Sequence, residues 1–217
     1  MVKVFKRFHS KIKAVRAGVL LAVMTGAIAF VAASAGAGTI SGATGLIEVP
    51  SADVLANGDL ELTVRYLDGE FGLAAVYGIL DDVEVGINNI RTGSDAGVGF
   101  VFKGTIHRET NDRPAIAIGL ESGQSYATVS KRLVPGVRLH GGYGIGRIKG
   151  LFAGVSYTLS TVSRGGAASP PTTLYGEYTS RGLNVGARMV LSPVISADFA
   201  LMDLKEATAA LGVRLRF

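Results

Sequence analysis

The 217-residue sequence predicts an all-β fold, an antiparallel, up-and-down, transmembrane β-barrel of about 12 strands, with a range of about 10–14. Three observations predict this fold. The N-terminus has the composition of a signal peptide, apolar residues recur at every second position from about residue 59 onward, and turn residues separate the alternating stretches. The 30 glycines argue against a helical bundle, because each glycine inside a helix costs about 1 kcal/mol.

The first 35 residues have the three parts of a cleaved, helical secretory signal peptide. A cationic stretch comes first and contains Lys3, Lys6, Arg7, Lys11, Lys13 and Arg16. Residues 17–32 are uncharged and mostly apolar, and small residues follow at 33–38. We predict cleavage after Ala35, with cleavage after Ala37 as the alternative. An uncleaved anchor would need about 20 apolar residues, whereas this stretch is shorter and diluted by alanine and glycine.

Outside this leader the chain is close to neutral. The six cations of the leader, subtracted from 22 basic residues, leave 16 basic against 17 acidic residues. The basic isoelectric point therefore comes from the leader, and the body has no basic stripe that would indicate a nucleic-acid partner. The chain has no cysteine, which excludes disulfides, thiolate metal sites, a cysteine nucleophile and a lipidated cysteine anchor.

Alternation of apolar residues with polar or small ones is typical of strands with two different faces. It is clear at residues 60–66, 71–79, 83–88, 98–103, 137–146, 151–160, 183–191, 195–201 and 211–217. Weaker candidates are 114–121, 125–133 and 172–179, and Lys131 interrupts the apolar face of the second. Turn residues lie between these stretches, and the longest irregular pieces are 104–113 and 161–171.

The two faces of these strands indicate a membrane rather than water. One face is almost free of charge, as contact with lipid requires, and the other is rich in glycine and serine with one or two charges per strand. We expect the second face to line a narrow or plugged lumen with Arg65, Glu84, Lys103, Arg138, His140, Glu177, Arg188, Asp198 and Arg214. The low aromatic content (7%) and short loops are less typical of such barrels, and a secreted soluble β-protein is the alternative.

The last alternating stretch ends on Phe217, in phase with Leu211, Val213 and Leu215. A C-terminal apolar-alternating strand that ends in phenylalanine resembles the signal read by the outer-membrane barrel-assembly machinery. The resemblance implies location in the outer membrane, with membrane lipid and that machinery as partners. The alternative is an ordinary edge strand.

Two other stretches resemble YjbH-like outer-membrane proteins. Residues 44–55 read TGLIEVPSADVL and are followed by NGDL at 57–60, which is similar to the opening segment of the family, TGLI-x-x-P-[ST]-A, before the first strand. Residues 82–86, DVEVG, are similar to a strand of the same family. The resemblance implies a role in the production or export of envelope exopolysaccharide, with polysaccharide or export components as partners. It supplies no catalytic residues.

The sequence therefore divides into a signal peptide at 1–35, a lead-in segment at 36–57 and an outer-membrane barrel at 58–217. Within the lead-in segment, Pro50 should interrupt strand pairing and Ser51 can cap a short turn. The segment either packs as a small plug or lid at the periplasmic mouth or is an ordered linker.

The body contains no familiar active site. His9 lies in the leader, His107 in a polar loop and His140 on the inward face, so we expect no metal site and no cofactor. His140 could meet Ser156 of a neighbouring strand, which makes a barrel lipid hydrolase one hypothesis, although no G-x-S-x-G elbow supports it. We predict a non-enzymatic envelope protein with a structural or transport role, and a narrow pore for ions or small solutes is the alternative.

Overall fold

The computed structural model describes residues 38–89, 97–121, 123–159, 163–164, 167–168 and 170–217. The predicted signal peptide and its cleavage site at Ala35 lie outside these residues. Within the described part of the chain, no helix is long and apolar enough to cross a membrane.

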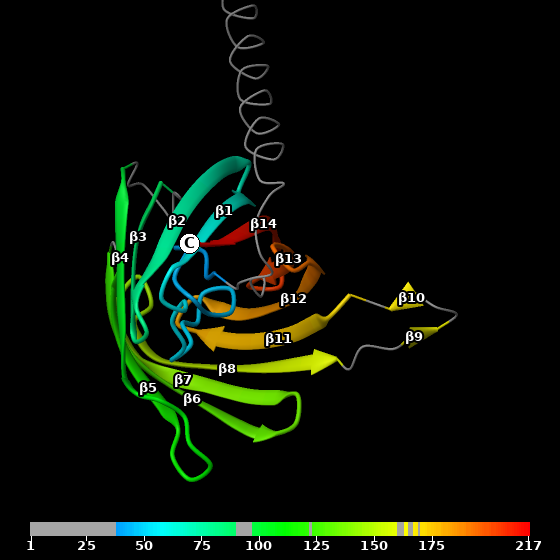
Figure 1. Cartoon of the computed structure of the whole chain (residues 1–217). Helices are drawn as coiled ribbons and strands as arrows, with labels where there is room; N and C mark the ends of the chain where they lie inside the picture. The colour runs from blue at the N-terminus through cyan, green and yellow to red at the C-terminus, as the bar shows by residue number, and fades with distance from the viewer. Residues whose placement is uncertain (1–37, 90–96, 122, 160–162, 165–166, 169) are drawn as a thin grey trace, which may run out of the picture. The chain divides into compact units, whose positions relative to one another are not determined.

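Twelve strands formed by the described residues close into one antiparallel barrel, which confirms the predicted fold (Figure 1). They are β1 (Asp59–Leu67), β2 (Glu70–Leu80), β3 (Val83–Asn88), β4 (Gly99–His107), β5 (Ala115–Glu121), β6 (Gln124–Val134), β7 (Val137–Gly146), β8 (Gly150–Leu159), β11 (Thr172–Thr179), β12 (Gly182–Ser192), β13 (Ile195–Met202) and β14 (Glu206–Arg216). Each pairs with its neighbour along the chain, and β1 pairs with β14 to close the circle. A separate ribbon of β9 (Ser163–Arg164) and β10 (Ala167–Ala168) lies between β8 and β11 in the sequence.

The two ends of the barrel carry different connections. The end at which β1 begins and β14 finishes, called the terminal end from here on, also carries the β2–β3, β6–β7 and β12–β13 turns. The opposite end carries the β1–β2, β5–β6, β7–β8 and β13–β14 turns. In bacterial outer-membrane barrels, both chain termini lie on the periplasmic side.

Two strands are longer than the sequence pattern predicts. Irregular structure is expected from residue 104, but β4 continues to His107, because its last residues pair with β5 across a register shift. β14 begins at Glu206 rather than at Leu211. Residues 207–210 are alanines and a threonine, whose hydropathy differs too little to produce a clear alternation, although they pair fully with β13.

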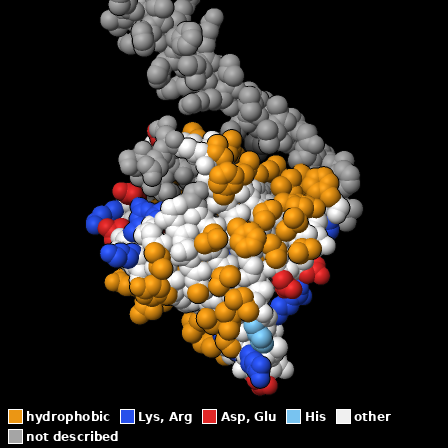
Figure 2. Space-filling model, turned by 90° about the vertical axis from the view of Figure 1, so that its left-hand side faces the viewer, with side chains coloured by type: hydrophobic (Ala, Val, Ile, Leu, Met, Phe, Trp, Pro, Cys, Tyr) orange, Lys and Arg blue, Asp and Glu red, His pale blue; other side chains and the backbone are white. Residues whose placement is uncertain are grey.

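The pleat of the strands places apolar side chains on the outer surface and polar ones inside. Large apolar side chains exposed on that surface include Leu73, Phe100, Ile118, Tyr143, Leu151 and Phe199. Figure 2 shows such side chains across the middle of one face, with charged side chains toward its edges. Buried charged side chains include Glu61, Arg65, Glu84, Lys103, Glu177 and Asp198. This distribution is the reverse of that in a water-soluble barrel and matches a wall surrounded by hydrocarbon.

Lys131, which interrupts the apolar face of β6, binds a loop instead of facing lipid. Its Nζ donates hydrogen bonds to the carbonyl oxygens of Thr110 and Asn111, each at 2.7 Å. Both acceptors belong to the β4–β5 loop at the terminal end. The long aliphatic stem of lysine lets its ammonium group reach such partners from the edge of an apolar surface.

We predict that Ile118→Arg destabilises the barrel, because Ile118 lies in the middle of β5 with its side chain exposed on the outer surface. An arginine at the midplane of a bilayer costs about 2–4 kcal/mol. Urea unfolding from lipid vesicles should show this loss, whereas the control Ile118→Val should change the free energy of unfolding by less than about 1.5 kcal/mol. Equal stability of wild type and Ile118→Arg would mean that this face does not contact hydrocarbon.

Candidate functional site: a plugged lumen

Residues 38–57, called the plug from here on, lie inside the barrel (Figure 1). Most of residues 38–52 are buried. Their backbone hydrogen bonds close on the plug itself, with Ile40 N donating to Ile47 O at 2.7 Å and Leu46 N to Val49 O at 2.9 Å. Among the described residues, no backbone–backbone hydrogen bond joins residues 38–55 to a strand of the barrel. The plug is therefore a folded piece of its own, and side chains attach it to the wall.

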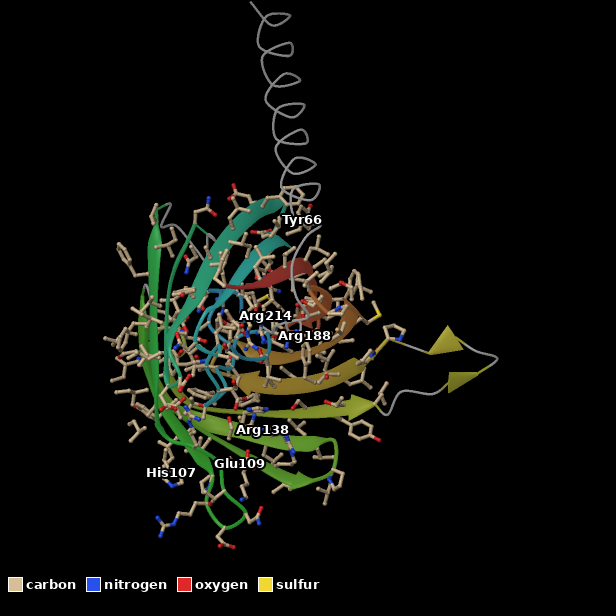
Figure 3. The ribbon with its side chains drawn as sticks, in the orientation of Figure 1. Tyr66, His107, Glu109, Arg138, Arg188 and Arg214 are labelled. Atoms are coloured by element: carbon tan, nitrogen blue, oxygen red, sulfur yellow. The ribbon has the colours of Figure 1, made fainter. Side chains whose placement is uncertain are left out.

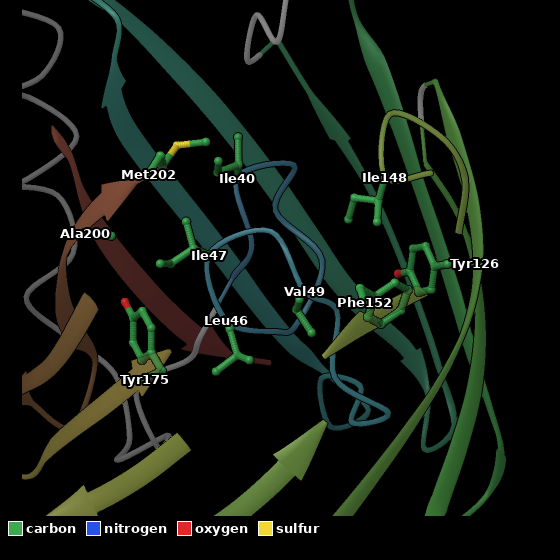
Figure 4. Close-up of a cluster of buried hydrophobic side chains, with 10 residues drawn as sticks. All are labelled: Ile40, Leu46, Ile47, Val49, Tyr126, Ile148, Phe152, Tyr175, Ala200 and Met202. Atoms are coloured by element: carbon green, nitrogen blue, oxygen red, sulfur yellow. The ribbon is translucent and has the colours of Figure 1, made fainter. Parts of the chain in front are cut away.

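Apolar side chains of the plug pack among side chains of the wall that lie on two sides of it (Figure 4). Ile40, Leu46, Ile47 and Val49 of the plug belong to one buried cluster with Tyr126, Ile148, Phe152, Tyr175, Ala200 and Met202. Burying an aliphatic side chain of this size contributes about 1.5–3 kcal/mol. The cluster therefore favours the state in which the plug occupies the lumen.

The Glu177 carboxylate on β11 accepts three backbone hydrogen bonds from the plug. The N–H groups of Ile47, Glu48 and Val49 lie 3.1, 2.7 and 3.0 Å from its oxygens. Asn184 Nδ2 on β12 donates a fourth at 2.8 Å. These donors carry no formal charge, so the plug backbone itself stabilises the buried carboxylate. Hydrogen bonds to an ionised acceptor are about twice as strong as those between neutral groups.

The Glu84 carboxylate on β3 binds the plug at two places. It accepts hydrogen bonds from Thr44 N at 2.8 Å and Thr44 Oγ1 at 2.6 Å, and from Leu55 N at 2.9 Å. Lys103 Nζ lies 3.0 Å from Glu84 and donates to Thr44 O at 2.7 Å. Both charged side chains are fully buried, and each also binds the plug, so this ion pair connects the wall to the plug.

Arginines of the wall donate to carbonyl oxygens of the plug. Arg188 forms an ion pair with Asp198 at 2.6 Å and donates to Gly45 O at 3.2 Å and to Gly38 O at 3.4 Å. Arg65 Nη2 donates to the same Gly38 oxygen at 3.3 Å. The wall therefore binds both kinds of backbone group in the plug, with carboxylates for N–H groups and cations for carbonyl oxygens.

The nine side chains expected to line the lumen have the following places. Seven are buried inside the barrel: Arg65, Glu84, Lys103, His140, Glu177, Arg188 and Asp198. Arg138 and Arg214 are partly exposed and form ion pairs with Asp53 of the plug and with Glu61, respectively. In Figure 3, Arg138, Arg188 and Arg214 all lie within the ring of strands. Phe217, proposed as an assembly signal, is exposed at the terminal end, and its N–H donates to Gly58 O at 2.9 Å.

Several interior residues that contact the plug were missed by sequence reasoning. Glu121 accepts a hydrogen bond from Ser41, Ser130 Oγ accepts one from Ala52 N at 2.9 Å, and Thr128 Oγ1 donates to Pro50 O at 2.8 Å. Glu61 was also missed, although it lies in phase with Arg65 on β1. The alternation on β1 places Glu61 on the same inward face as Arg65, so the sequence could have identified Glu61 as a lumen residue. Serine and threonine occur on either face of a strand, so the sequence does not indicate that Ser130 and Thr128 contact the plug.

Residues 44–55 of the plug and residues 82–86 at the start of β3 contact each other. Thr44, at the start of the first stretch, binds Glu84 in the second. Two glycines of these stretches have no room for a side chain. A Cβ on Gly45 would lie 2.5 Å from a methyl group of Thr39 and 2.6 Å from Val49 O, and one on Gly86 would lie 2.6 Å from Ala75 O. Gly45 therefore allows close packing within the plug and Gly86 allows close packing of β3 on β2, while the Thr44–Glu84 contact joins the plug to β3.

A cavity of about 690 Å³ remains between the plug and the wall formed by β6, β7, β8, β11 and β12. Its lining includes Asp53, Arg132, Arg138, His140, Ser156 and Thr173. His140 Nε2 lies 3.2 Å from Ser156 Oγ, and Nδ1 lies 2.9 Å from Ser130 Oγ. Within the described residues, the imidazole thus has a hydroxyl on each nitrogen and no carboxylate partner, unlike the base of a serine hydrolase triad. No group of three or more His, Asp or Glu side chains in the described residues could hold a metal ion.

No protein-family model matches the chain, and no curated protein matches it. Solved structures do resemble it. The KdgM porin in complex with disordered oligogalacturonate has a TM-score of 0.52 and 8% identity, with 73% of this chain and 99% of that chain covered. A second KdgM porin structure has a TM-score of 0.51 and 9% identity, with the same coverage. The outer membrane protein Omp33 of Acinetobacter baumannii has a TM-score of 0.44 and 13% identity, with 73% and 97% covered.

The chain therefore has the fold of an outer-membrane porin. The inside-out surface and the closed barrel place it in the outer membrane, in contact with membrane lipid. Its lumen differs from an open channel because residues 38–57 occupy it.

We predict that Glu177→Gln loosens the plug. A glutamine oxygen carries no charge and cannot replace a carboxylate that accepts three plug N–H groups. Hydrogen bonds to charged groups contribute about 1.5–3 kcal/mol, so hydrogen exchange at the amides of residues 47–49 should accelerate by at least about tenfold. In the control, Asp59→Asn, those amides should exchange at the wild-type rate, since the Asp59 carboxylate pairs with Arg216. Unchanged exchange in Glu177→Gln would contradict the role given to this carboxylate.

Proposed function

We propose that the protein is a non-enzymatic outer-membrane channel whose lumen is closed at rest by its own plug, and that small polar solutes pass when the plug moves. One observation carries the proposal. Side chains, rather than strand pairing, join the plug to the wall. The plug can therefore leave its position while every strand of the barrel keeps both of its neighbours.

A lumen emptied of the plug would be lined by polar and charged groups. Glu84, Lys103, Glu177, Arg188 and Asp198 all face the interior, and they would exchange plug contacts for water. Barrels of eight strands are filled by their own side chains, whereas barrels of 16–18 strands leave an aqueous channel. Twelve strands lie between these limits, which agrees with an interior wide enough for the plug and for a narrow water-filled path.

The closed state should predominate at rest. The apolar cluster favours the inserted plug, and two buried carboxylates would lose most of their hydrogen bonds if it left. A ligand or partner opens such a system only if it binds the open state more tightly than the closed one. We therefore propose a channel that opens in response to a ligand or partner.

A link to envelope exopolysaccharide is our second candidate, and it rests on the YjbH-like stretches. The contact between Thr44 and Glu84 supports it, because the two stretches that carry the resemblance form one structural unit. With it we propose removal of the leader after Ala35 and recognition of the final strand, ending in Phe217, by the barrel-assembly machinery.

We predict that the double variant Glu84→Gln/Glu177→Gln opens the barrel more often than wild type. Both substitutions remove a negative charge that binds plug N–H groups. Single-channel recordings in planar bilayers should show wild type closed for most of the time and the double variant with frequent open events. Asp59→Asn, which removes a carboxylate that pairs with Arg216, should record like wild type.

Folding of each variant is checked by its shift in gel mobility on boiling. Steady open events in wild type would contradict a lumen closed at rest. If the double variant shows faster exchange at plug amides but no conductance, the channel proposal fails and a structural role remains.

A further inference from the structure

The β7–β8 turn, at the opposite end of the barrel, folds into the lumen. It consists of Arg147, Ile148 and Lys149, and Ile148 is fully buried whereas Lys149 is exposed. Ile148 belongs to the buried cluster that contains the apolar side chains of the plug (Figure 4). A residue of a turn, rather than of a strand, therefore completes the apolar cluster around the plug.

Glycines of β7 and β8 make room for this inward turn. Gly146 and Gly150, which flank the turn, have φ angles of 105° and 88°, in the left-handed region that favours glycine. A Cβ on Gly144 would lie 2.4 Å from Ile148 O, so a larger residue there would collide with the backbone of the turn. These glycines of the run at 141–150 therefore allow the turn to pack against the inner wall.

Hydrogen bonds join the β7–β8 turn to the turns on either side of it. Arg147 N donates to Gly123 O, between β5 and β6, at 2.9 Å. Lys149 N donates to Ser180 Oγ, between β11 and β12, at 3.1 Å. Residues 147–149 themselves belong to no strand. The turn can therefore move away from the lumen with the loss of these hydrogen bonds, while every strand of the barrel stays paired.

Two arginines in the turns at this end form ion pairs with carboxylates that bind the plug or belong to it. Arg147 lies 3.7 Å from the Glu121 carboxylate, which accepts a hydrogen bond from Ser41 of the plug. Arg181, in the β11–β12 turn, lies 3.3 Å from the buried Glu48 carboxylate of the plug. The turns at the opposite end therefore contact the plug through both apolar and charged groups.

We propose that residues 147–149 are a latch, and that the plug leaves its position only after this turn has moved away and withdrawn Ile148 from the cluster. The inference rests on the proposed function, because it names the step that precedes opening of the channel. Since both termini of bacterial outer-membrane barrels are periplasmic, the latch faces the cell exterior. A ligand outside the cell that binds the displaced turn more tightly than the inward one would favour the open channel.

The chain has no cysteine, so a single engineered thiol reports when a chosen position becomes accessible. Ile148→Cys and Ile47→Cys, made in the full chain and solubilised in detergent, are each treated with a bulky, water-soluble maleimide. Both isoleucines are buried to nearly the same extent, but Ile47 belongs to the plug. Because the latch moves before the plug, Ile148→Cys should react at least about tenfold faster. Equal rates would overturn this order of events.

The labelled Ile148→Cys protein tests whether the latch holds the plug, because the bulky label prevents the turn from returning. Hydrogen exchange at the amides of residues 47–49 should then be at least about tenfold faster than in the unlabelled protein. The matched control is Lys149→Cys, which carries the same label on the same turn at an exposed position. Its plug amides should exchange at the wild-type rate. Wild-type exchange in both labelled proteins would overturn the latch.

Ile148→Ala tests the same contact without a label. It removes most of a fully buried side chain, so exchange at residues 47–49 should accelerate by at least about tenfold. Amides of β2 should exchange as in wild type, because they stay paired with β1 and β3. Each variant must keep its gel shift on boiling, and unchanged exchange at the plug in folded Ile148→Ala would contradict the proposal.

Conductance separates a failure of the latch from a failure of the channel. Faster plug exchange together with frequent open events in labelled Ile148→Cys would support both proposals. Faster exchange without open events would support the latch and contradict the channel, whereas open events with wild-type plug exchange would contradict the latch. On intact cells, Lys149→Cys should react with a maleimide on a polymer too large to cross porins, and no reaction would overturn control from the cell exterior.

Discussion

The barrel depends on one requirement, which is that every backbone N–H and C=O group in contact with hydrocarbon must be hydrogen-bonded within the protein. The circle of pairings from β1 through β14 and back to β1 meets this requirement because a closed sheet has no edge strand. The pleat then sends alternate side chains inward, where they meet no lipid. Polar and charged residues are tolerated there and would be costly on the outer face.

The plug introduces a second set of backbone groups into this interior, and the wall provides their partners. Glu84 and Glu177 accept hydrogen bonds from plug N–H groups, while Lys103 and Arg188 donate to plug carbonyl oxygens. A buried charge without partners is strongly unfavourable, so the wall and the plug each satisfy groups that the other would leave unpaired. These contacts hold the plug in the lumen. In the proposed channel, movement of the plug requires that other hydrogen-bond partners replace them.

The strands were predictable because their signal is local. The alternation at residues 71–79 or 151–160 depends only on neighbours in the sequence, and β2 and β8 formed there. The pattern was weaker where small residues replaced large ones, as at the start of β14. The alternation also did not explain why the aromatic side chains of Tyr126 and Tyr175 lie on the inner face of the barrel. Both are buried in the cluster that includes apolar residues of the plug, and this contact exists only in the folded structure.

The sequence by itself determined which face of the clearly alternating strands is apolar, because a period of two is set residue by residue, and from this an outer-membrane barrel with a polar interior was predicted. Only the tertiary structure decided where residues 38–57 lie and which groups bind them. The contact of Glu84 with Thr44 spans 40 positions, and that of Glu177 with Glu48 spans 129. Which wall residues contact the plug depends on their positions across the lumen, and these positions are set only when the strands have closed into a barrel.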